Sequence, residues 1–252
     1  MRPIPHSAVT HAHMVEYLDD IVAEVATSVT TLKSAKEFKA IYKNSVAGFV
    51  SLKAFSRKQL PLVRSAAELS RRLPVLVVTR QAVQAMAELR RFIELIAWWP
   101  YFADHPVEWS HFQSNPWLGF VKYESNPIAF AAHREISYYF AYIVEKAQCS
   151  STSILRECAG QLQAGYSETS RFVHAGGLAD PNSAMSTFDT LTPALLREFS
   201  ALQKSVLRAG SVIAAWSNPE GLHRLPAVER SWFDWLVGKA ATNALRSGTV
   251  CD

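Results

Sequence analysis

The residues best suited to chemistry lie in one short stretch of the chain. Tyr166, Ser170 and His174 recur every four residues, so on an α-helix all three lie on one face. Arg171 lies beside them, and Gly176–Gly177 supplies the backbone freedom that ends a helix. A histidine in the last turn is near the negative end of the helix dipole, which favours its protonated form. The spacing predicts a polar, partly cationic cluster that suits an anion or RNA.

The same spacing fits a structural role equally well. Tyr166 and Ser170 can belong to a hydrogen-bonded network at a helix junction, and His174 can satisfy the last carbonyls of its helix. A second polar pair, Arg90 and Glu94, lies in a long apolar segment. These two residues are four apart, which is the spacing of an intrahelical ion pair. The pair is either part of a site or an inward salt bridge that fixes helix packing.

Two segments together resemble a known family. Leu89-Arg90-Arg91-Phe92-Ile93-Glu94, followed by aromatic residues, resembles an Arg-x-x-x-Glu helix of HEPN-like helical proteins of prokaryotes. Tyr166-x-x-x-Ser170-x-x-x-His174 is similar to a Tyr-x-x-Leu-Ser-x-x-x-His segment that follows in the same proteins. The resemblance covers about residues 80–215 and implies a helical bundle, frequently dimeric, of toxin–antitoxin, abortive-infection or other anti-phage systems.

The resemblance also implies a reaction. Many such proteins are metal-independent ribonucleases, in which an Arg-x(4–6)-His motif from each of two protomers meets in one cleft. There the arginine would stabilise the charge on the phosphorane-like transition state, and the histidine would act as general base or acid on the 2′-hydroxyl. In this sequence only two residues separate Arg171 from His174, and no Arg–His pair has the family's spacing. Residues three apart on a helix are still neighbours, so a joint role stays open.

Positive charge is concentrated in the N-terminal third of the chain. The formal net charge is +4, yet the segment from Lys33 to Arg80 holds eleven basic and two acidic residues. This asymmetry predicts an acidic partner, either RNA or an acidic protein surface. The alternative is a solvated basic layer whose charge is compensated by acidic neighbours in the fold. The candidate nucleic-acid-binding residues are Lys36, Lys39, Lys43, Lys53, Arg57, Arg64 and Arg71.

The apolar pattern is helical almost throughout, and it predicts an all-α protein. We expect one continuous domain, in which basic helices of residues 1–79 form a layer on a HEPN-like bundle of residues 80–252. Pro74 is expected to mark a boundary. A packed connection is expected over residues 103–127, with a short helix near Glu108, and a polar loop over residues 176–191. The expected helices cover about residues 8–32, 34–72 with a break near Pro61, 80–99, 128–147, 152–174, 193–216 and 226–245.

Other features favour a cytoplasmic, cofactor-independent protein. No apolar run reaches the length of a membrane span, and the three cysteines have no metal-ligand spacing. Two Glu-x-x-His patterns, Glu108 to His111 and Glu220 to His223, lie next to prolines rather than on long helices, so we expect no metal site. No glycine-rich phosphate loop is present. The aromatic stripe of Trp232, Phe233, Trp235 and Leu236 is expected to be core or dimer contact.

These observations favour an RNA-directed effector or accessory protein of a prokaryotic anti-phage or toxin system, with metal-independent ribonuclease activity as one form. The alternative is a non-enzymatic helical subunit that docks on a larger effector complex. A helical metalloenzyme that uses the Glu-x-x-His pairs is a third, weaker option. In each of the first two cases we expect a homo-oligomer or a subunit of a complex.

Overall fold

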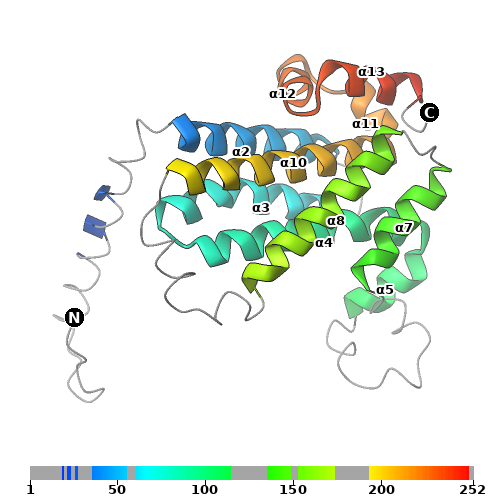
Figure 1. Cartoon of the computed structure of the whole chain (residues 1–252). Helices are drawn as coiled ribbons and strands as arrows, with labels where there is room; N and C mark the ends of the chain where they lie inside the picture. Colours follow the sequence, from blue (N-terminus) through cyan, green and yellow to red (C-terminus); the bar gives the residue numbers. More distant parts are fainter. Residues whose placement is uncertain are drawn as a thin grey trace.

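The computed structural model describes residues 19, 22–23, 26–27, 36–55, 61–114, 135–148, 153–173 and 193–249. Every regular element within these residues is a helix, so the predicted all-α class is confirmed (Figure 1). The helices are α2 (Lys36–Phe55), α3 (Pro61–Val78), α4 (Ala82–Asp104), α5 (Pro106–Ser114), α7 (Ile136–Lys146), α8 (Ile154–Val173), α10 (Pro193–Ser217), α11 (Pro219–His223), α12 (Ala227–Val237) and α13 (Lys239–Ser247).

Helix α10 buries one face over most of its length, and it packs against α2, α4, α8 and α12. Figure 1 shows α10 running alongside α2. Small residues bring the neighbouring helices close, because a Cβ added at Gly210 would lie 2.8 Å from the ring of Phe92 on α4. The side of α10 that faces the core is therefore apolar or small over several turns. It includes Val206, Leu207, Ala209, Val212, Ile213, Ala214 and Ala215.

One hydrophobic core joins α2 and α3 to the later helices. Leu52 of α2 and Leu73 of α3 belong to the same buried cluster as Phe92 of α4, Leu162 of α8 and Leu207 of α10. The basic helices thus share their core with the rest of the described chain.

A buried polar network crosses the interface between α2 and α10. The amide of Asn44 donates to the backbone carbonyl of Ser200 at 3.1 Å and to the side-chain oxygen of Gln203 at 3.3 Å. The amide of Gln203 in turn donates to the hydroxyl of Ser45 at 2.7 Å. Buried amides need such partners, so the network fixes one alignment of the two helices.

The prediction that Pro74 marks a boundary was wrong. Pro74 is buried inside α3, which continues to Val78 before the chain turns at Arg80, a residue with φ of 56°. Likewise, α4 was expected to end at Trp99, but it runs through Pro100 to Asp104. A proline in a helix costs about 3 kcal/mol. Burial of the apolar residues around each proline offsets that cost.

The expected helix over residues 226–245 is two helices. Gly238 separates α12 from α13 with φ of 94°, a conformation that favours glycine. The guanidinium of Arg208 on α10 donates to the carbonyl of Val237 at the end of α12. A tertiary hydrogen bond thus satisfies a carbonyl that the helix leaves open.

Other expected elements agree with the structure where it describes them. The break near Pro61 is present, since α3 begins there, and α5 is the predicted short helix that contains Glu108. Ser153 caps α8 by accepting from the backbone N–H of Arg156 at 3.2 Å. Most of the expected helix over residues 8–32, all of residues 115–134 and the expected loop over residues 176–191 lie outside the described residues.

Within the described part of the chain, no helix combines the length and the apolar character that crossing a membrane requires.

Candidate functional site

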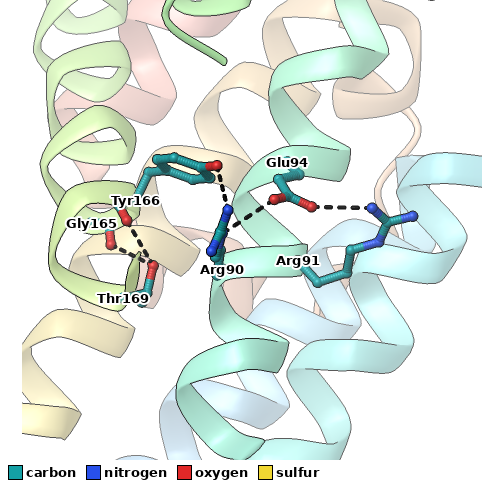
Figure 2. A network of polar contacts seen from close by, with 6 residues as sticks. All are labelled: Arg90, Arg91, Glu94, Gly165, Tyr166 and Thr169. Atoms are coloured by element: carbon teal, nitrogen blue, oxygen red, sulfur yellow. Dashed lines mark hydrogen bonds and ion pairs between the residues drawn. The ribbon is translucent and has the colours of Figure 1, made fainter. Parts of the chain in front are cut away.

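Arg90 of α4 is the centre of a polar network between α4 and α8 (Figure 2). Its guanidinium donates to the hydroxyl of Tyr166 on α8 at 2.7 Å, and its Nε lies 3.3 Å from a carboxylate oxygen of Glu94. The other oxygen of Glu94 accepts from Arg91 at 3.1 Å. The Arg90–Glu94 ion pair predicted from the spacing is therefore present, and the carboxylate joins two arginines.

The Arg90–Glu94 pair is largely shielded from water. The side chains of Arg90 and Glu94 are 17% and 18% exposed, whereas that of Arg91 is 50% exposed. The Arg90 guanidinium also lies 4.8 Å from the centre of the Tyr166 ring. A shielded arginine held by a carboxylate, a hydroxyl and a ring face has a well-defined position.

Gly165 permits the close approach of α8 that creates this contact. A Cβ at Gly165 would lie 2.7 Å from a methyl group of Val206 on α10 and 3.3 Å from Ile93 on α4. A side chain here would therefore require Val206 or α8 to shift. Tyr166 follows directly, so the glycine sets the distance at which its hydroxyl reaches Arg90.

The next turn of α8 adds two hydroxyl groups to this region. Thr169 is fully buried. Its hydroxyl donates to the backbone carbonyl of Gly165 at 2.9 Å and lies 3.1 Å from the backbone carbonyl oxygen of Tyr166. The hydroxyl oxygen of Ser170 is buried and has no hydrogen-bond partner among the described residues. Ser170 was predicted from its spacing, whereas Thr169 was not, because a threonine within an apolar helix face has no distinguishing sequence pattern.

The structure does not place the cationic end of the predicted cluster. Arg171 is the antepenultimate residue of α8, but its side chain lies outside the described set, as does all of His174. Tyr166 and Ser170 are on α8 as predicted. The described part of the cluster is thus a phenol and a serine hydroxyl on α8, beside the Arg90–Glu94 pair of α4.

The exposed face of α2 is a second candidate, which we call the lysine face. Four lysines on α2 are exposed: Lys36, Lys39, Lys43 and Lys53. The one carboxylate of α2, Glu37, lies 3.6 Å from Arg197 of α10. Because Glu37 already faces a cation, the lysine face keeps a net positive charge.

On α3 the predicted basic residues are exposed but differ in their pairing. Arg71 forms an ion pair with Glu68 at 2.9 Å, whereas Arg64 has no ion pair among the described residues. Arg71 also lies 5.9 Å from the ring of Phe49 on α2, which Lys53 approaches to 5.4 Å. The basic character of α2 therefore extends onto the adjoining part of α3. Arg57, the remaining predicted basic residue, lies outside the described residues.

Trp235 of α12 is partly exposed, whereas Phe233 of the same aromatic stripe is buried. Phe233 is fully buried, but Trp235 is 36% exposed. The ammonium groups of Lys43 on α2 and Lys204 on α10 lie 4.4 and 5.4 Å from the centre of its ring. The stripe is therefore only partly core, since Phe233 is buried and Trp235 lies beside two lysines at the surface. The contact depends on three helices, which explains why the sequence pattern did not reveal it.

A third polar cluster lies where α4, α5 and α7 meet. The carboxylate of Asp104 accepts from the hydroxyl of Tyr142 and pairs with the ammonium of Lys146. Nearby, the hydroxyl of the buried Tyr101 donates to Glu108 at 2.6 Å, and the His105 ring stacks on Tyr101 with centroids 4.1 Å apart. The sequence pattern does not indicate this cluster, because α4 and α7 are far apart in the chain.

Electrostatics at this junction favour an ionised Asp104 beside a neutral Tyr142. Desolvation raises the pKa of Asp104, but hydrogen bonds from Lys146 and Tyr142, with their charge attraction, lower it below its usual value overall. The pKa of Tyr142 is raised, mainly by desolvation and next by the hydrogen bond to Asp104 and the negative charge of that carboxylate. Each group is matched to a partner, which is the arrangement of a structural junction.

The glutamates of the two Glu-x-x-His patterns each have another partner in the structure. Glu108 accepts the hydrogen bond from Tyr101, and Glu220 forms an ion pair with Arg224 at 3.4 Å. His223 is exposed, and the side chain of His111 lies outside the described residues. Among the described residues, no group of three or more potential metal ligands comes together.

Comparisons with known proteins place this chain in no family. No protein-family model matches it, and neither a curated protein nor a solved structure does. The class that the described residues define is an all-helical protein.

Proposed function

We propose that this protein binds RNA through the lysine face of α2, as an effector or accessory protein of a prokaryotic anti-phage or toxin system. We place it in the cytoplasm, acting as a homo-oligomer or within a complex. The observation that carries the proposal is the charge of α2: four exposed lysines and one carboxylate that faces Arg197 instead. Phosphate neutralisation by such a surface supplies affinity without sequence specificity.

Aromatic residues on and around the lysine face favour nucleic acid over a purely acidic protein partner. Tyr42 lies on α2 between lysines and is 59% exposed, and Trp235 lies beside Lys43. Basic groups interleaved with exposed rings suit a strand whose phosphates need cations and whose bases need stacking surfaces.

The HEPN-like assignment, and with it ribonuclease activity, is a second part of the proposal. Its support is the Tyr166–Arg90–Glu94 network, which gives the two segments of the resemblance a physical connection between α4 and α8. In this proposal, Arg90, Glu94 and Tyr166 hold the two helices in place, and Arg171 and His174 act on the RNA. Arg171 would stabilise charge on the phosphate, and His174 would transfer the 2′-hydroxyl proton.

RNA binding is tested by fluorescence anisotropy of labelled total RNA at increasing salt. We expect wild-type affinity to fall steeply as salt rises, and Lys36→Gln/Lys39→Gln to lower both the affinity and the salt slope. Lys239→Gln, which removes one exposed charge on α13, is the control against which the loss of affinity per lysine is compared. No binding by the wild type at low salt would overturn the proposal.

Cleavage is tested separately in EDTA with transfer RNA. We expect cleavage by the wild type and none by His174→Ala or Arg171→Ala, with RNA affinity retained by His174→Ala. Binding without cleavage would assign an accessory role and remove the ribonuclease. Neither binding nor cleavage, with co-purification of a neighbouring gene product, would favour the alternative of a helical subunit that docks on a larger effector complex.

A further inference from the structure

We propose that Trp235, Lys43 and Lys204 form a subsite for one base and the adjoining phosphates of single-stranded RNA. The inference rests on the proposed RNA binding and deepens it, because it names the form of RNA and the group that a single ring recognises. Three helices contribute one residue each: α12 supplies the indole, and α2 and α10 supply the ammonium groups.

The geometry brings both cations to one ring. The two ammonium groups are 4.4 and 5.4 Å from the ring centre of Trp235, so they lie within about 10 Å of each other. Among the described residues, neither Lys43 nor Lys204 has a carboxylate within ion-pair distance. Like charges gathered without a counter-ion favour binding of an anion between them.

A phosphodiester suits this arrangement better than an isolated anion does. A cation over an exposed ring is held weakly, whereas an ammonium group bound to phosphate makes a charge-assisted hydrogen bond. Phosphates would therefore draw Lys43 and Lys204 toward themselves and uncover the face of Trp235. One base next to these phosphates can then stack on the uncovered indole.

Besides the two lysines, the ring of Trp235 contacts an aromatic neighbour that leaves it partly exposed. Trp232 meets Trp235 nearly edge-on, with centroids 6.3 Å apart and an interplanar angle of 81°, and it also packs against the core. This edge-on contact does not cover the indole, since Trp235 remains 36% exposed. A duplex hides the faces of its bases, so the subsite selects single strands.

The test compares single-stranded oligoadenylate with a duplex of equal length, using fluorescence anisotropy and full-length protein. Trp235→Ala is expected to weaken single-strand binding about tenfold and to leave duplex binding unchanged. Trp235→Phe is expected to retain most of the affinity, because a smaller ring still stacks. The salt slope should be the same in both variants as in the wild type, since no charge is removed.

The lysines are tested by the salt slope, which should change when their charges are removed. Lys43→Gln/Lys204→Gln should reduce the magnitude of the single-strand salt slope by about 0.7 for each lysine, whereas Lys239→Gln should leave it unchanged. Circular dichroism checks that each variant is folded. We expect the Trp235 variants to fold, because the side chain is partly exposed.

The outcomes separate this inference from the proposed function. Wild-type binding with an unaffected Trp235→Ala variant would overturn the subsite and leave RNA binding through the lysine face intact. Equal weakening of single-strand and duplex binding would also overturn it. A wild type that binds neither form would overturn both the subsite and the proposed RNA binding. If polyphosphate competes as well as the single strand does, binding depends on charge alone and the subsite is overturned.

Discussion

The guanidinium of Arg90 on α4 donates a 2.7 Å hydrogen bond to the hydroxyl of Tyr166 on α8, across 76 residues of sequence. The bond joins two helices that are also in contact through Gly165. Glu94, which is also on α4, forms an ion pair with the same guanidinium of Arg90. The stability of the α4–α8 interface should therefore be sensitive to each of these groups.

Tyr166→Phe removes the hydroxyl and leaves the ring in place. We expect the free energy of unfolding to fall by about 1–2 kcal/mol, because a shielded charged donor loses its acceptor. Urea denaturation measures the change. Tyr42→Phe is the matched control, since its side chain is 59% exposed, and the expected effect is below about 0.5 kcal/mol. Equal effects of the two substitutions would show that the hydrogen bond does not stabilise the interface.

Gly165→Ala and Gly160→Ala should have opposite effects although both residues lie on α8. At Gly165 the added Cβ would lie 2.7 Å from Val206, so we expect destabilisation by about 1–3 kcal/mol. At Gly160 no atom lies within 4 Å of the added Cβ. We therefore expect stabilisation by about 0.5–1 kcal/mol there, from helix propensity alone. Thermal unfolding of the two variants decides, and stabilisation by both would refute the close packing of α8.

Asp104 should make the protein less stable in acid. Its pKa is lowered in the folded state, so its contribution is present above the ordinary value of 3.8 and is lost as the pH falls through the folded value. Asp104→Asn should therefore be destabilising at pH about 7, and the difference from the wild type should shrink at pH about 3. Urea denaturation at both values tests this. A difference that is independent of pH would mean that the charge of Asp104 does not contribute.

Cys158 should be unreactive in the folded protein. It is fully buried on α8, and burial raises the pKa of its thiol to about 12. Since the thiolate is the reactive form, a neutral-pH thiol reagent should label Cys158 only when the protein is unfolded. The measurement uses a Cys149→Ser/Cys251→Ser background, in which Cys158 is the remaining cysteine. Rapid labelling under native conditions would contradict the buried position.

Periodicity predicted most of the helices because each buries a continuous apolar stripe. The range expected for α10 agrees with the structure to within one residue at its C-terminal end, and the short helix at Glu108 is present. Local rules failed where tertiary packing outweighs them. Pro74 and Pro100 are buried within helices, and the break at Gly238 comes from a backbone conformation that periodicity does not detect.

The candidate sites were predictable only in so far as they are local. Spacing on one helix predicted the Arg90–Glu94 pair, and the local concentration of charge predicted the basic residues of α2. Contacts between helices were not predictable, because they require the positions of both partners. The hydrogen bond to Tyr166, the junction of Asp104 with Tyr142, and the lysines at Trp235 all belong to this second kind.

The amide network between Asn44 and Gln203 has a consequence for how this chain can be divided. Gln203 is fully buried, and its side chain finds its partners on α2. A fragment that begins at residue 80 would leave this amide without those partners, and it would expose Leu207, which packs against Gly48. Such a fragment should be insoluble on its own, and residues 36–79 supplied as a separate peptide should restore it.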